Sequence, residues 1–163
     1  MDTGREIHKQ AEPLYNVAAK RIYQMALYMT GIPSAAEQIA IKAFCEAFDR
    51  TGDKENIRLF QANAMAAIYR YSRKELGTFH GSTASFALPG ADGSERQRIA
   101  QMLGRLCLKD RFIVLAFCSQ RYSVEQISKM LRLPPALVRK RLNAALYKAT
   151  DGFHLSPKGC QTT

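Results

Sequence analysis

The sequence predicts an all-α protein in which two small helical domains are joined by a flexible linker. Apolar residues recur at spacings of three and four, and the alternating pattern of β-strands is missing. The stretch 77–94 is rich in Gly, Ser, Thr and Ala, lacks helical periodicity and is longer than most loops inside one compact domain. We therefore expect a helical domain over residues 1–76, a linker over 77–94, a second helical domain over 95–152 and a disordered tail over 153–163.

The first domain contains three predicted helices. The first fits residues 13–30, with a proline in its first turn and a Gly and a Pro after its end. The second fits residues 34–48 and begins with the S-x-x-E pattern of Ser34 and Glu37, which predicts a capping box. This helix is apolar almost all round, so we expect neighbouring elements to cover several of its sides. The third is expected over residues 55–76.

The second domain contains four predicted helices, over residues 95–107, 109–119, 123–131 and 135–150. Ser123 and Gln126 form an S-x-x-Q capping-box pattern at the start of the third of these. The double proline at 134–135 starts the fourth, because proline is tolerated in the first turn of a helix. Two helices joined by so short a turn are a candidate helix-turn-helix, which makes the domain a four-helix DNA-binding module.

The last predicted helix has an apolar side and a basic side. Its apolar residues at helical spacing are Val138, Leu142, Ala145 and Leu146. The residues that point away from them are Lys140, Asn143, Ala144 and Tyr147, with Arg139 and Arg141 at the boundary. Arg and Lys suit guanine edges and phosphates, and Asn can pair with adenine, so this side suits the major groove of duplex DNA. The alternative is a solvated basic face without a partner.

The net charge of +10 predicts a polyanionic partner, which is most simply nucleic acid, with an acidic membrane surface as the alternative. Nine Lys or Arg residues and two acidic residues lie between Leu106 and Ala149, which gives a net charge of +7. Residues 1–105 carry fourteen Lys or Arg residues and eleven acidic residues, which gives a net charge of +3. The positive charge is therefore concentrated in the predicted helix-turn-helix domain.

Other classes of protein find little support in the sequence. There is no run of eighteen apolar residues and no apolar stretch of a secretory signal, so we expect a cytoplasmic protein that does not bind membranes. The four cysteines lack CxxC spacing and the three histidines are scattered, so we expect reduced thiols, no metal and no cofactor. Without a nucleophile or acid–base pair at motif spacing, or a Gly-rich phosphate loop, we expect no enzyme.

Residues 106–149 resemble region 4 of the bacterial sigma-70 family of RNA polymerase sigma factors, particularly the extracytoplasmic-function group. That family shows a charged turn with an arginine before an apolar helix, then S-x-x-E-I-A-x-x-L-G, then T-V-K-S-R-L. The residues that match these three parts in turn are Arg111, Phe112, Val114 and Leu115; Ser123, Ile127 and Leu131; and Val138, Arg139, Arg141 and Leu142. Arg132 replaces the family's glycine, so a residue that is strained at positive φ, or a different turn, must make the bend.

The resemblance also implies roles for individual residues. In the family, positions on the last helix read the minus-35 promoter element, and here those positions are Arg139, Lys140, Asn143 and Ala144. Contacts with the DNA backbone are expected from Ser123, Arg141 and Tyr147. Ala144 stands where an arginine is common and can make at most an apolar contact, so the target sequence need not be the usual one.

The first domain is similar to sigma region 2, but it is divergent. "AEQIAIKAFCEAF", residues 36–48, stands where the family has an A-E-D-L-V-Q-E-x-F helix that binds the polymerase clamp. The candidate clamp residues Gln38, Ile41 and Lys42 replace Asp, Gln and Glu, which removes two acidic groups and adds a cation. These changes favour the alternative of a DNA-binding regulator that no longer docks on polymerase.

The end of the third predicted helix, "YRYSRK", interleaves aromatic and basic residues. Aromatic faces can stack on unpaired bases while neighbouring cations hold the backbone. The candidates for binding the opened minus-10 strand are Tyr69, Arg70, Arg73 and Lys74. The alternative is that Tyr71 packs in the core and the cations are solvated.

The resemblance implies a transcription initiation factor that would direct core RNA polymerase to specific promoters. Its partners would be promoter DNA, core RNA polymerase and an anti-sigma factor, and it would be a monomer when free. Two alternatives stay open. One is a stand-alone helix-turn-helix regulator that no longer docks on polymerase, and the other is a helical protein-interaction module whose basic face docks an acidic protein.

Overall fold

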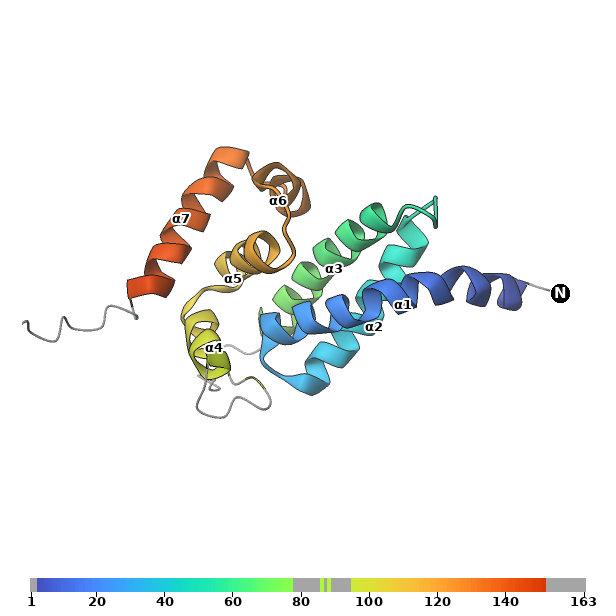
Figure 1. Cartoon of the computed structure of the whole chain (residues 1–163), viewed down its shortest axis with the longest axis horizontal. Helices are drawn as coiled ribbons and strands as arrows, with labels where there is room; N and C mark the ends of the chain where they lie inside the picture. The colour runs from blue at the N-terminus through green and yellow to red at the C-terminus, as the bar shows by residue number, and fades with distance from the viewer. Residues whose placement is uncertain (1–2, 78–85, 87, 89–94, 152–163) are drawn as a thin grey trace, which may run out of the picture.

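The computed structural model describes residues 3–77, 86, 88 and 95–151, and these form helices without strands (Figure 1). The all-α prediction is confirmed, and the stretch 78–94 separates two helical parts. The predicted tail and most of the predicted linker lie outside the described residues. No helix among the described residues is both long and apolar enough to cross a membrane.

The first part consists of α1 (Thr3–Thr30), α2 (Pro33–Arg50) and α3 (Ile57–Gly77), which all pack against one another. Helix α1 begins ten residues earlier than predicted and contains Pro13 in its interior. Proline removes one helical hydrogen bond, to the carbonyl of Lys9. Both residues are exposed, so water can replace the missing donor and the helix continues through them.

The predicted capping box of Ser34 and Glu37 is not formed. Helix α2 begins at Pro33, its N-cap is Ile32, and no side chain caps it. The physical reason is that a proline at the first helical position has a fixed φ and lacks the donor that would otherwise need a partner. The helix therefore starts one residue before Ser34, which then lies inside the first turn.

The expectation that α2 is covered on several sides is only partly correct. Its buried residues are Ala36, Ile39, Ala43 and Ala47. Ile41 is 65% exposed, because α1 and α3 cover two sides of the helix and leave the third open. An apolar groove between α1 and α2 runs past this side chain and is lined by Tyr15, Phe44 and Cys45 among others.

The second part consists of α4 (Glu95–Arg105), α5 (Leu108–Val114), α6 (Val124–Leu131) and α7 (Pro135–Asp151), with a π-helical turn, η1 (Leu115–Ser119), directly after α5. The four predicted helices are present at close to the expected positions. In η1 the N–H of Gln120 donates to the carbonyl of Leu115 (3.1 Å), which is the wider hydrogen bond of a π-helix. Helix α7 packs on α4, α5 and α6.

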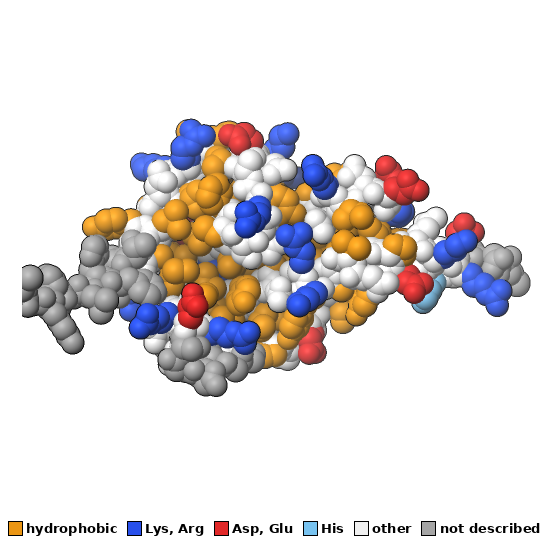
Figure 2. Space-filling model, viewed as in Figure 1, with side chains coloured by type: hydrophobic (Ala, Val, Ile, Leu, Met, Phe, Trp, Pro, Cys, Tyr) orange, Lys and Arg blue, Asp and Glu red, His pale blue; other side chains and the backbone are white. Residues whose placement is uncertain are grey.

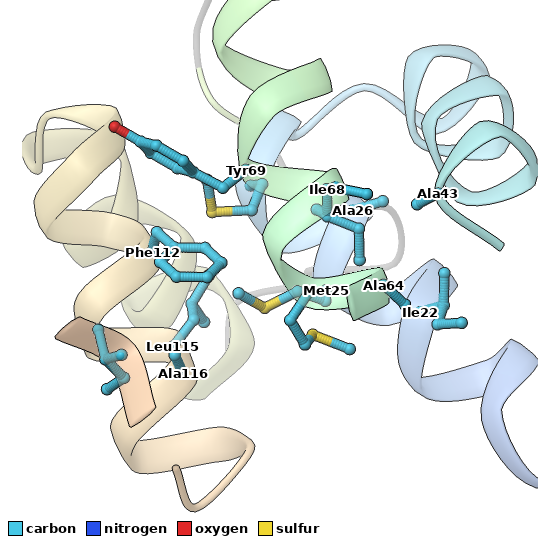
Figure 3. Close-up of a cluster of buried hydrophobic side chains, with 14 of the residues drawn as sticks. Ile22, Met25, Ala26, Ala43, Ala64, Ile68, Tyr69, Phe112, Leu115 and Ala116 are labelled. Atoms are coloured by element: carbon cyan, nitrogen blue, oxygen red, sulfur yellow. The ribbon is translucent and has the colours of Figure 1, made fainter. Parts of the chain in front are cut away.

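The two parts are packed against each other and share one apolar core. Helix α5 lies against α1 and α3, and α6 lies against α3. The ring of Tyr69 in α3 packs on the ring of Phe112 in α5, with 5.1 Å between their centroids (Figure 3). Both side chains are buried. The predicted domains are therefore in direct contact in this structure.

Arg111 lies buried at the junction of the two parts. Its Nε donates to the carbonyl of Leu103 (2.9 Å), Nη1 to that of Met29 (2.5 Å) and Nη2 to that of Leu106 (3.3 Å). Met29 and Leu103 lie in the last turns of α1 and α4, where carbonyls lack helical partners and the helix dipole favours a cation. Burial lowers the pKa of Arg111 to about 10, so it remains a cation at neutral pH.

Candidate nucleic-acid interface

The helix-turn-helix begins at a capping box. Ser123 is the N-cap of α6, and its hydroxyl oxygen accepts a hydrogen bond from the N–H of Gln126 (3.2 Å). In return, the side-chain oxygen of Gln126 accepts from the N–H of Ser123 (2.8 Å). The N–H groups of Ser123 and Gln126, which have no acceptor within the helix, each therefore gain a side-chain acceptor. The capping box predicted here is confirmed.

The two serines offer a matched test of capping. Ser123→Ala is expected to lower the free energy of unfolding by about 1 kcal/mol, because an N-cap hydrogen bond is lost. Ser34→Ala is expected to change it by less than about 0.5 kcal/mol, because Ser34 is exposed and caps nothing. Urea denaturation of both variants measures the difference, and equal losses would contradict the assignment of the caps.

The turn between α6 and α7 is made by Arg132 in a left-handed conformation. Its φ is 53° and its ψ is 45°. Without a glycine at this position, the bend requires either a strained residue at positive φ or a different kind of turn, and the structure shows the strained residue. The turn is closed by the N–H of Leu133, which donates to the carbonyl of Ser128 (3.0 Å). The hydroxyl of Ser128 donates in turn to the carbonyl of Leu133. Helix α7 then starts at Pro135, as the double proline predicts.

Arg132→Gly is expected to raise the free energy of unfolding. A residue with a Cβ loses about 1–2 kcal/mol in the left-handed region, and glycine removes that strain at a smaller cost in unfolded-state entropy. Lys129→Gly is the control, because Lys129 is an exposed residue inside α6, where glycine costs about 1 kcal/mol. Urea denaturation is expected to show a higher free energy of unfolding for Arg132→Gly and a lower one for Lys129→Gly. A lower free energy of unfolding in both variants would contradict strain at Arg132.

Helix α7 presents the side predicted to face DNA. Val138, Leu142 and Ala145 are buried against the rest of the second part. The residues predicted to face DNA, Arg139, Lys140, Asn143, Ala144 and Tyr147, are all exposed. In Figure 2, Lys and Arg side chains gather at the upper left, over α6 and the start of α7. The division of this helix into a buried and an exposed side was therefore predictable from its apolar spacing.

The two arginines that flank this face differ in their surroundings. Arg139 lies 3.8 Å from a carboxylate oxygen of Glu125, and both side chains are more than 60% exposed (64% and 62%), so the pair is weak and a phosphate can replace it. Arg141 donates to Asp110 (2.9 Å) and ties α7 to α5. This hydrogen bond raises the pKa of Arg141. In this structure Arg141 is held by the fold, and its contact with the DNA backbone stays a prediction.

The candidates for strand binding at the end of α3 are only partly at the surface. Arg70 is exposed but pairs with Glu46 (2.6 Å), while Arg73 and Lys74 are exposed. The expectation that Tyr69 stacks on bases does not fit the packed arrangement, because the residue is only 8% exposed and its ring packs on Phe112. The periodicity of α3 places it on the side that faces α5. Tyr71, the tyrosine suggested for the core, is only partly buried.

The candidate clamp residues Gln38, Ile41 and Lys42 are all exposed on α2. Spacings of three and four place them on one side of the helix. This side borders the apolar groove between α1 and α2, where Tyr15 is 61% exposed. The surface is therefore mainly apolar, with the carboxylate of Glu37 in its lining and the cation of Lys42 beside it.

Sequence reasoning missed a basic cleft between α3 and α6. The cations that line it are Arg50, Arg70 and Arg73 from the first part and Lys129 and Arg132 from the second. Among the described residues that line it, none is acidic. The cleft exists only because the two parts are packed together, so no local pattern could predict it.

His, Cys, Asp and Glu side chains do not gather in any group of three that could hold a metal ion within the described part of the chain. Cys45, Cys107 and Cys118 are free, exposed thiols. No protein-family model matches the chain, and no curated protein matches it.

Proposed function

We propose that this chain is a transcription initiation factor of the sigma type, which directs core RNA polymerase to promoters and reads the minus-35 element with α7. The observation that carries the proposal is the capped helix-turn-helix with an exposed face of Arg139, Lys140, Asn143 and Ala144. Its strained turn at Arg132 and its proline start at Pro135 fit the same motif. The excess positive charge of this domain supports a polyanionic target.

The exposed face of α7 suits direct readout of bases. Arg139 and Asn143 are four residues apart, so they lie one helical turn apart on the same side of α7. Arginine binds the two acceptors of guanine, and asparagine binds the acceptor and donor of adenine. Ala144 can contact only a thymine methyl group. The three candidates for contacts with DNA phosphates are Ser123, Arg141 and Tyr147.

The first part would dock on the polymerase clamp and bind the opened minus-10 strand. Docking would use Gln38, Ile41 and Lys42, with the apolar surface around Ile41 in place of acidic contacts. The strand would contact Arg73 and Lys74 through phosphates. Promoter DNA, core polymerase and an anti-sigma factor are therefore the proposed partners of a monomeric, cytoplasmic protein without enzymatic activity or cofactor.

Binding to purified core RNA polymerase tests the proposal. We expect the chain to co-elute with core polymerase and to support run-off transcription from a promoter selected out of a random duplex library. Ile41→Glu should weaken co-elution, because it places a charge in an apolar contact. Ile7→Glu is the matched control, since Ile7 is 50% exposed near the start of α1. A chain that neither co-elutes nor selects any promoter would refute the proposal.

A second candidate function is a stand-alone DNA-binding regulator, which the changes at Gln38, Ile41 and Lys42 favour. It predicts specific, salt-dependent duplex binding without any affinity for polymerase. A helical protein-interaction module is the third candidate, and it predicts that Lys140→Glu abolishes binding to an acidic protein. If the Lys140→Glu variant still binds the acidic protein, Lys140 does not contact that protein.

A further inference from the structure

The basic cleft between α3 and α6, which lie next to each other in Figure 1, has two adjoining sections. The main section has a volume of about 530 Å³, and five cations line it: Arg50, Arg70, Arg73, Lys129 and Arg132. The second section, of about 370 Å³, shares Ala62 and Gln126 with the first. It adds Arg58 from α3 and Arg121 from the chain before α6, and none of its described lining residues is acidic. Seven cations therefore line one continuous cleft.

The chemistry of these cations suits phosphate groups. Six of the seven are arginines, and Lys129 is the exception. The planar guanidinium presents parallel N–H donors that bind two oxygens of a phosphate at once. Arg50 and Arg70 share the carboxylate of Glu46, at 2.9 and 2.6 Å, which holds the two arginines together and neutralises only one of their charges. The cleft therefore keeps an excess of positive charge, which favours a ligand with several negative charges.

Two of the arginines occupy left-handed backbone positions. Arg121 has a φ of 58° and Arg132 a φ of 53°, and among the described residues no other non-glycine residue has a positive φ. One precedes α6 and the other follows it, and each lines one section of the cleft. Glycine would make either turn with less strain. What glycine could not supply at either position is a cation in the cleft, and such strain is characteristic of functional sites.

The main section also contains an apolar wall and two side-chain amides. The wall consists of Leu59, Ala62 and Ala66 from α3 with Met130 and Leu131 from α6. The amide nitrogen of Asn63 donates to the hydroxyl of Thr51 (3.0 Å), and the amide oxygen of Gln126 accepts within the capping box. The oxygen of Asn63 and the nitrogen of Gln126 can therefore contact a ligand. One acceptor and one donor beside an apolar wall suit a nucleobase.

We propose that the cleft between α3 and α6 binds a nucleoside polyphosphate, with its phosphates on the arginines and its base against the apolar wall. This inference goes beyond the proposed function and does not depend on it. The volume of the main section lies within the range of roughly 300–1,000 Å³ that is typical of small-ligand sites. Since the described lining holds cations and no carboxylates, the arginines bind the phosphates directly and need no bridging divalent cation.

Titration of the full chain with GTP that carries a fluorescent N-methylanthraniloyl group tests the proposal. We expect a saturable rise in anisotropy that persists in EDTA and that unlabelled GTP and ATP reverse. Inorganic triphosphate should compete about tenfold less well than GTP, because it has no base to place on the apolar wall. Equal competition by triphosphate would overturn the role of the nucleoside. The absence of saturable binding up to about 1 mM would overturn the site as a whole.

Removal of one cation from each wall of the cleft tests its location. Arg73→Ala combined with Lys129→Ala should raise the Kd for the labelled nucleotide about tenfold or more. The matched control combines Arg96→Ala with Arg98→Ala, which removes the same charge from exposed positions of α4 outside the cleft. The control should raise the Kd less than about twofold, because distant exposed charges are screened. Equal losses in both double variants would show unspecific attraction and overturn the site.

Arg132→Gly separates the loss of a ligand contact from damage to the fold. Glycine relieves the strain at this position, so the variant is expected to be more stable than the natural chain. It should nevertheless bind the labelled nucleotide about fivefold more weakly, because one guanidinium is missing from the cleft. An unchanged Kd in this variant would overturn the role of the strained arginine in holding phosphates.

Two further measurements distinguish the cleft from the proposed DNA-binding surfaces. The double variant Arg139→Ala and Asn143→Ala should bind the nucleotide as tightly as the natural chain, since neither residue lines the cleft. If a single-stranded oligothymidine displaces the nucleotide at a lower concentration than GTP does, the cleft is a strand-binding site and the proposal is overturned. Nucleotide binding by a chain that does not co-elute with core polymerase would support this inference and count only against the proposed function.

Discussion

Arg111→Met is expected to lower the free energy of unfolding by about 3 kcal/mol. The variant removes three hydrogen bonds from a charged group, each of which contributes about 1.5–3 kcal/mol, to the carbonyls of Met29, Leu103 and Leu106. The carbonyl of Leu103 still accepts from the N–H of Leu106 (3.2 Å), so the loss is less than the sum of the three. Part of this loss is offset, because the variant no longer buries a cation. Methionine fills the space of the arginine stem, so the loss reflects polar contacts more than a cavity.

Urea denaturation measures this loss, with Arg105→Met as the control. Arg105 is an exposed arginine at the end of α4, so the same substitution there is expected to change the free energy of unfolding by less than about 0.5 kcal/mol. If Arg111→Met costs no more than Arg105→Met, the buried guanidinium does not hold the junction together.

Replacing Arg139 and Asn143 together by alanine is expected to weaken binding to the selected duplex about 100-fold. Each bidentate contact with a base contributes about 1–3 kcal/mol of discrimination, and about 1.4 kcal/mol corresponds to a factor of ten. Both side chains are exposed and neither holds the core of the helix-turn-helix. The folded state should therefore keep its stability while the specific affinity falls.

Fluorescence anisotropy on the selected duplex and on a scrambled duplex measures this effect. We expect the double variant to lose its preference between the two sequences. Lys148→Ala is the control, because Lys148 is an exposed cation near the end of α7, outside the proposed reading positions. It should weaken both duplexes by the same small factor. A double variant that loses affinity for both duplexes equally would show that α7 does not read bases.

The positions of α6 and α7 could be predicted from the sequence because their signals are local. A serine cap, a double proline and apolar residues at helical spacing fix α6 and α7 regardless of what surrounds them. The exposed side of α7 followed from the same spacing. Ser34 shows the limit of such signals, because its capping pattern is genuine in sequence but Pro33 starts the helix one residue earlier.

What could not be predicted depends on contacts between distant parts of the chain. Tyr69 and Tyr71 look equivalent in sequence, and only the position of α5 decides that Tyr69 is the buried one. Arg111 follows a local charged turn in the sequence, but its hydrogen bond to Met29 joins residues 82 positions apart. Phe86 lies in a stretch without periodicity, so only the folded structure shows that its ring lies over the guanidinium of Arg111. Local patterns therefore predicted the exposed face of α7 better than the junction between the two parts.

The π-helical turn η1 determines how the chain leaves α5. The N–H of Gln120 donates to the carbonyl five residues back, Leu115, and the N–H of Tyr122 donates to the carbonyl six residues back, Ala116. These bonds are wider than those of an α-helix, so the last turn opens before the chain leaves it. Ser123, the N-cap of α6, follows directly after Tyr122. The hydrogen bonds that end one helix thus also fix the point at which the next helix begins.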